Sequence, residues 1–196
     1  MGALIWLTSA LSAVNALVLR LGLWLGATCV ALMVASILIQ VFFRYVLGNA
    51  LAWPEELARF LMLWMTGLMA PTAYRQGGFV GIDLLVRLLP RAVAAGLALV
   101  LLGVAMAVLV MGFRIGWAEV TGFGGRFETD ALRVPVSWDL SEWKKVPRAW
   151  TMASLAVGVT IMIAVTAELM LRAVVRMLGG GDRLPMIEGS VTAGAE

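Results

Sequence analysis

Three long stretches without a charged side chain limit what this chain can fold into. They cover residues 21–43, 92–113 and 149–167. Each is close to the roughly 20 apolar residues that a helix needs to cross the hydrocarbon core of a bilayer. Inside a bilayer the backbone polar groups must bond within the segment, which a helix achieves. The chain is therefore predicted to be an all-α integral membrane protein, with spans near residues 21–43, 91–113 and 149–171.

A fourth transmembrane helix is predicted over residues 54–75, with charges at its entrance. Pro54 suits a first helical turn because the amide hydrogen it lacks would be unpaired there, and Glu55 and Glu56 place negative charge at the positive helix end. Arg59 lies one turn after both carboxylates and can pair with one of them. The other carboxylate is either a cap satisfied by water among the headgroups or a docking point for another subunit.

The same span contains a predicted kink between Gly67 and Pro71. Proline has no amide hydrogen to donate to the carbonyl of the residue four positions earlier, and its ring crowds that turn. For Pro71 that carbonyl belongs to Gly67.

Two short amphipathic helices are predicted outside the spans. Residues 1–19 place apolar side chains on one helical face and polar ones on another, which indicates a helix lying in the membrane interface and ending before Arg20. Residues 79–89 form the second, in which Asp83 and Arg87 are one turn apart and are expected to pair.

The remaining segments are polar. Residues 114–148 combine charges, glycines and tryptophans, which predicts an extramembrane loop that either rests on the membrane surface or docks a partner. Residues 179–196 are glycine-rich and predict a mobile tail. Residues 1–178 are expected to form a single membrane domain.

Composition excludes several classes of function. Hydrophobic residues make up 62% of the chain and charged residues 14%, whereas about 25% of an average soluble domain is charged. The chain has no histidine, which excludes histidine-ligated haem or zinc and a histidine general base. No cofactor and no metal site is predicted in this chain. Nucleic-acid binding is not expected, because the arginines are scattered between the spans.

The residues around the second span resemble those of a known family. They follow one another in the order Arg44, Tyr45, Trp53, Glu55, Glu56, Arg59, Trp64, Gly67, Ala70, Arg75 and Asp83. This order, together with the four spans, resembles the small membrane subunit of tripartite ATP-independent periplasmic (TRAP) transporters. The chain departs from the family pattern at residues 79–81, where many relatives have a histidine before the aspartate, and in a longer loop before the fourth span.

The resemblance implies a non-catalytic subunit of the bacterial inner membrane with both termini cytoplasmic. It would brace a separate large subunit that carries the solute, usually an organic acid, and binds the coupling sodium ions. A periplasmic binding protein would deliver the solute. Contacts to these partners or to membrane phospholipids are expected from Arg44, Trp53, Glu55, Glu56, Arg59, Arg75, Asp83 and Arg87.

Two other functions remain open from the residues alone. A self-assembling four-helix scaffold or channel is favoured by small residues at helical spacing in the first span. A membrane enzyme would need titratable residues facing one cavity, and the sequence offers them only near the span ends. Orientation is also open, since basic residues divide almost evenly between the two sides, with a lean toward cytoplasmic termini.

Overall fold

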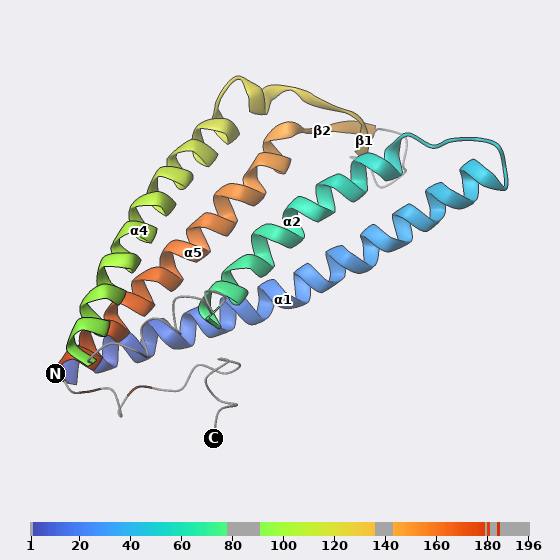
Figure 1. Cartoon of the computed structure of the whole chain (residues 1–196). Coiled ribbons are helices and arrows are strands. Elements are labelled where there is room, and N and C mark those ends of the chain that lie inside the picture. The colour runs from blue at the N-terminus through green and yellow to red at the C-terminus, as the bar shows by residue number, and fades with distance from the viewer. Residues whose placement is uncertain (1, 78–90, 136–142, 179, 181–183, 185–196) are drawn as a thin grey trace. The chain divides into compact units, whose positions relative to one another are not determined.

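The structure is a computed structural model that describes residues 2–77, 91–135, 143–178, 180 and 184. These residues form long helices and one pair of strands (Figure 1). The elements are α1 (Gly2–Tyr45), α2 (Trp53–Arg75), α4 (Arg91–Thr121), the 3₁₀ helix η1 (Gly124–Arg126), β1 (Glu128–Pro135), β2 (Trp143–Pro147) and α5 (Arg148–Met177). The mainly helical fold is confirmed, and the strand pair is an addition that the sequence did not predict.

Three described helices are long and apolar enough to cross a membrane. They are α1, the Gly96–Thr121 part of α4, and α5. Helix α2 occupies the fourth predicted span, but it is not among these three. The chain is therefore a membrane protein with three such helices, and a crossing by α2 stays a prediction.

Helix α1 corrects the predicted break at Arg20. One helix of 44 residues replaces the separate interfacial helix and first span. Arginine is a good helix former, and the Arg20 side chain is exposed, so its charge does not end the helix. At 1.5 Å per residue this helix is about 66 Å long, more than twice the roughly 30 Å hydrocarbon core.

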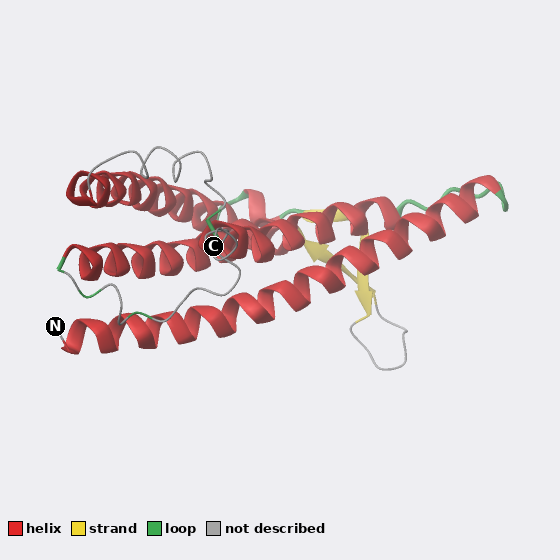
Figure 2. Ribbon diagram, turned by 60° about the horizontal axis from the view of Figure 1, so that its bottom comes forward, coloured by secondary structure: helices red, strands yellow, loops and turns green. Residues whose placement is uncertain are grey.

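The predicted loop over residues 114–148 is also corrected. Helix α4 continues to Thr121, and the strands β1 and β2 form an antiparallel pair before α5 begins (Figure 2). In this pair Arg133 lies opposite Lys145, and Pro135 lies opposite Trp143. The predicted helix over residues 79–89 lies outside the described residues, as does nearly all of the predicted tail.

The chain divides into two compact units, each described here by itself. Unit 1 consists of Met1–Gly22, Met69–Gly112 and Val159–Glu196, and unit 2 consists of Leu23–Leu68 and Phe113–Gly158. The apolar centre of unit 1 is formed by buried Leu19, Tyr74 and Val165, with Ile161, Met162 and Leu169 packed against them.

In unit 2, α2 and α5 approach each other closely at glycines. A Cβ atom added at Gly67 would lie 2.5 Å from the carbonyl oxygen of Ser154, and one added at Gly158 would lie 2.7 Å from the carbonyl oxygen of Gly67. Any larger side chain at either position would force the helices apart. Pro71 lies inside α2, which continues through it to Arg75, and the kink stays a prediction.

Candidate functional site

The first turns of α2, in unit 2, hold four of the eight residues predicted to make contacts. The carbonyl of Pro54 accepts a hydrogen bond from the Ser36 hydroxyl at 3.0 Å, which ties α2 to α1. The Arg59 guanidinium pairs with the Glu55 carboxylate at 3.2 Å, and both side chains are about two-thirds exposed. One carboxylate therefore pairs within the helix, as predicted, although an exposed pair of this kind contributes only about 0–1 kcal/mol.

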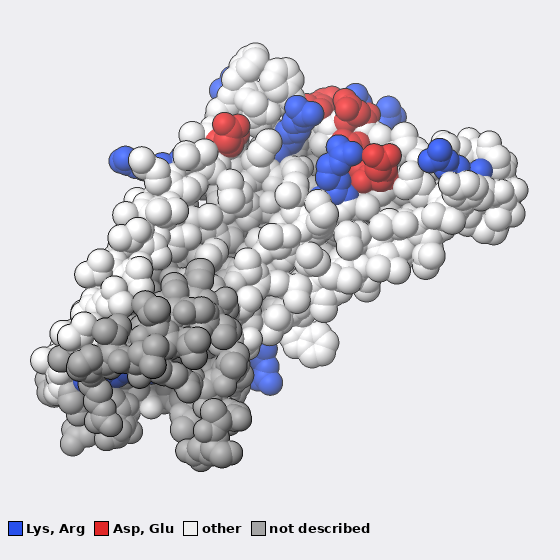
Figure 3. All heavy atoms as spheres, in the orientation of Figure 1, with Lys and Arg blue, Asp and Glu red and all other residues white. Residues whose placement is uncertain are grey.

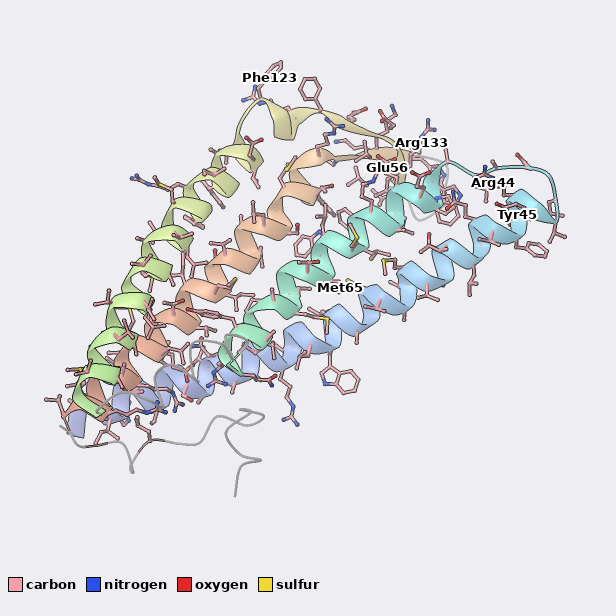
Figure 4. All side chains as sticks on the ribbon, in the orientation of Figure 1. Arg44, Tyr45, Glu56, Met65, Phe123 and Arg133 are labelled. Atoms are coloured by element: carbon pink, nitrogen blue, oxygen red, sulfur yellow. The ribbon has the colours of Figure 1, made fainter. Side chains whose placement is uncertain are left out.

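Glu56 has a role that neither sequence interpretation included. Its carboxylate accepts hydrogen bonds from the backbone amides of Asp130, Ala131 and Leu132, at 3.1, 2.5 and 2.8 Å. Bonds from N–H groups to a charged acceptor are stronger than bonds between neutral groups. Glu56 therefore fastens β1 to the start of α2, and Figure 4 shows it there with Arg133 of β1 nearby.

A cavity lies in unit 2 where the strands meet the first turns of α2 and α5. Its volume is about 670 Å³. The Trp64 indole of α2 donates to the carbonyl of Trp150 at 3.1 Å, which links α2 to the start of α5. Figure 3 shows charged side chains gathered over the strands and the start of α2, on a surface that is otherwise mostly uncharged. The cavity is lined by Trp53, Leu57, Phe60, Ala131, Leu132, Arg133, Val134, Trp143, Val146 and Trp150.

Unit 1 contains a buried group of charged and polar side chains, called here the Glu168 cluster: Ser12, Asn15, Arg75, Glu168 and Arg172. Glu168, fully buried, receives two hydrogen bonds from Arg75, at 2.8 and 3.0 Å. It also accepts from Arg172 at 2.9 Å and from the Asn15 amide at 2.8 Å. Both carboxylate oxygens therefore have charged donors, as a buried carboxylate requires.

Ser12 connects both arginines of the Glu168 cluster to α1. Its hydroxyl lies 2.9 Å from a guanidinium nitrogen of Arg75 and 2.7 Å from one of Arg172, and its carbonyl accepts from Arg75 at 3.1 Å. Asn15 also donates to the carbonyl of Ala164 at 3.2 Å. Segments of α1, α2 and α5 are thus joined by one hydrogen-bonded network, and Figure 1 shows the start of α1 (blue) beside the end of α5 (red).

The start of α1 has its polar face inside and its apolar face outside. Thr8, Ser12 and Asn15 are buried, whereas Leu7 and Val14 are half exposed or more. The predicted polar face is present and packs against α2 and α5, while the position of this segment in the membrane interface stays a prediction. This inverted pattern is expected where the surroundings of a helix are lipid, because lipid solvates apolar side chains and leaves polar ones to bond inside.

The predicted contact residues fall into separate places. Arg75 joins the Glu168 cluster, and Trp53 lines the cavity. Arg44 is exposed and lies 5.8 Å from the ring centre of Tyr45. Asp83 and Arg87 lie outside the described residues. Within the described ranges no group of three acidic, histidine or cysteine side chains could hold a metal ion.

The Glu168 cluster itself was missed from sequence. Two signals were available: Glu168 and Arg172 are one turn apart in an apolar helix, and Ser12 and Asn15 share the polar face of residues 1–19. Nothing in the spacing indicated that Arg75 would join them.

Comparison with known proteins gives one family finding and one negative result. The family model described as "Tripartite ATP-independent periplasmic transporters, DctQ component" matches residues 33–176. The matched region includes the start of α2, the strand pair, and Arg75, Glu168 and Arg172. No curated protein matches the chain.

Proposed function

Because the chain belongs to the DctQ component family of tripartite ATP-independent periplasmic transporters, we propose that it is the small, non-catalytic subunit that braces the large transport subunit in the membrane. The observation that carries this proposal is the Glu168 cluster. A carrier needs polar groups that a solute or ion can reach near the middle of the membrane. In the described part of unit 1, the carboxylate of Glu168 is instead occupied by Arg75, Arg172 and Asn15.

Such a network favours a fixed frame over a moving one. Opening it would leave charges buried and unpaired, which costs several kcal/mol. A transport domain that moves through the membrane needs a stationary neighbour, and a helix bundle held by internal ion pairs is suited to that task. The exposed apolar side chains of α1, such as Trp24 and Leu38, offer surface to lipid or to helices of a large subunit.

The transported solute, the coupling ions and the partner proteins are part of the same proposal. The large subunit would carry an organic acid or similar solute and bind the coupling sodium ions, and a periplasmic binding protein would deliver the solute. The complex would lie in the bacterial inner membrane. The resemblance around α2 supports these assignments.

Reconstitution tests the proposal directly. Liposomes holding this chain alone, the large subunit alone, or both are given a sodium gradient and binding protein loaded with its solute. We expect uptake only when both membrane subunits are present. Uptake by this chain alone, or undiminished uptake by the large subunit alone, would exclude the bracing role.

Labelling from one side tests the proposed orientation, with both termini cytoplasmic. In a Cys29→Ala background, single cysteines replace Asn49, Phe123 or Leu178, all of which lie outside the long helices. An impermeant thiol reagent on the periplasmic side should label the first two and spare Leu178→Cys. Labelling of Leu178→Cys alone would reverse the orientation.

A further inference from the structure

The cavity of unit 2 is lined mainly by apolar and aromatic side chains. Its volume of about 670 Å³ falls within the roughly 300–1,000 Å³ of pockets that hold small molecules. Helix α2 supplies Trp53, Leu57 and Phe60 from one face, at spacings of four and three residues. Trp143 and Trp150 line it while remaining 53% and 57% exposed, so the cavity opens beside these rings.

Two cations lie together on the strand pair that forms one wall. The register places Arg133 directly opposite Lys145, so both side chains project from the same face of the pair. Like charges directly opposite each other destabilise a sheet. Arg133 lines the cavity, and Lys145 lies beside Arg133 but is not among the lining residues. Among the described residues no ion pair involves Arg133 or Lys145. This part of the wall therefore favours a bound anion.

Glu56 does not neutralise this pair. Its two oxygens accept the amides of Asp130, Ala131 and Leu132, and no ion pair joins it to Arg133. The Glu56 carboxylate therefore holds the strand backbone, and the Arg133 guanidinium beside the cavity has no counter-ion among the described carboxylates.

We propose that this cavity binds one anionic phospholipid, with an acyl chain among the aromatic rings and the phosphate between Arg133 and Lys145. A phospholipid supplies both chemistries in one molecule. A free phosphate would satisfy the cations and leave the apolar walls empty, whereas an uncharged apolar molecule would do the reverse. Tryptophan is enriched at membrane interfaces, where one side of the ring is apolar and the other wet, and anionic headgroups attract basic side chains. A planar guanidinium also matches the oxygens of a phosphate group.

Lipid titration of the purified full chain tests this proposal by native mass spectrometry. The probes are phosphatidylglycerol, which is anionic, and phosphatidylcholine, which has no net charge. We expect one phosphatidylglycerol per chain, bound at least about tenfold more tightly than phosphatidylcholine. Equal affinity for the two lipids would overturn the proposal.

Three variants locate the site. Arg133→Gln combined with Lys145→Gln should reduce the affinity for phosphatidylglycerol about tenfold. Arg114→Gln is the control, because it removes a positive charge from an exposed side chain of α4 that does not line the cavity, and it should stay within about twofold of the wild type. Ala131→Phe adds a ring to the cavity wall and should also weaken phosphatidylglycerol, although both cations remain.

Other outcomes would contradict the proposal. Equal losses for Arg114→Gln and the double variant would mean a general charge effect. Competition by inorganic phosphate with no effect of Ala131→Phe would mean a site for a free anion. Displacement of the lipid by the large subunit would mean that the cavity is a protein interface. Unfolding temperatures in lipid-free detergent check folding: the double variant should be at least as stable as the wild type there, and only the wild type should gain stability from phosphatidylglycerol.

Discussion

Glu168→Gln removes the negative charge that faces the buried Arg172 and the largely buried Arg75, while keeping the size of the side chain. The wild-type carboxylate accepts from Arg75, Arg172 and Asn15. A glutamine has only one oxygen, and its amide group turns a donor toward donors. Removing one partner of a buried ion pair costs about 3–5 kcal/mol. For a chain of this length each 1 kcal/mol lowers the unfolding temperature by about 2–4 °C, so we expect a fall of roughly 6–20 °C.

The assay is thermal unfolding of the purified chain in detergent, followed by tryptophan fluorescence. Glu55→Gln is the control, because it makes the same chemical change in the exposed pair with Arg59 and should cost no more than about 1 kcal/mol, or about 4 °C. The reasoning would be refuted if the two variants lowered the unfolding temperature equally.

Two further predictions concern unit 2. Glu56→Ala should speed hydrogen exchange by at least about tenfold at the β1 amides that bond to Glu56, because hydrogen bonds to a charged acceptor are worth about 1.5–3 kcal/mol. Glu55→Ala is the control and should leave the exchange of these amides unchanged. Unchanged exchange in Glu56→Ala would mean that Glu56 does not hold the strand. Gly158→Leu should reduce the yield of monodisperse protein, because the added atoms meet the backbone of Gly67. Gly103→Leu is the control and should be tolerated, because the space around Gly103 is open. Equal yields of the two variants would contradict the close approach of α2 and α5.

The helical segments could be predicted because they depend on local features. Each uncharged run lies inside an observed helix, and the Pro54, Glu55 and Glu56 entrance marks the start of α2 to within one residue. The predicted break at Arg20 was wrong because the cost of a charge depends on its surroundings and not on sequence position. A charge is costly only where it meets lipid without a partner, and the side chain of an exposed arginine in a long helix can extend away from the lipid.

The contacts that hold each unit together internally depend on residues far apart in sequence. Arg75 and Glu168 are 93 residues apart, and Glu56 is 76 residues from Leu132. Local spacing contains no information about such pairs. The strands were read as loop for a related reason: β1 combines acidic and basic side chains and has an irregular register, and its backbone is held partly by a carboxylate from another element.

The position of Glu168 late in the chain also affects how the protein is made. Arg75 precedes its partner Glu168 by 93 residues. At a synthesis rate of about 5–20 residues per second, this separation is a delay of roughly 5–20 s. During that interval the first two helices hold an arginine whose counter-charge has not yet left the ribosome. The arrival of α5 brings the Glu168 carboxylate that neutralises Arg75, so α5 completes the ion pairing of unit 1. A nascent chain cut short before Glu168 would retain an uncompensated arginine, which is a chemical difference by which membrane quality control could separate unfinished from finished molecules.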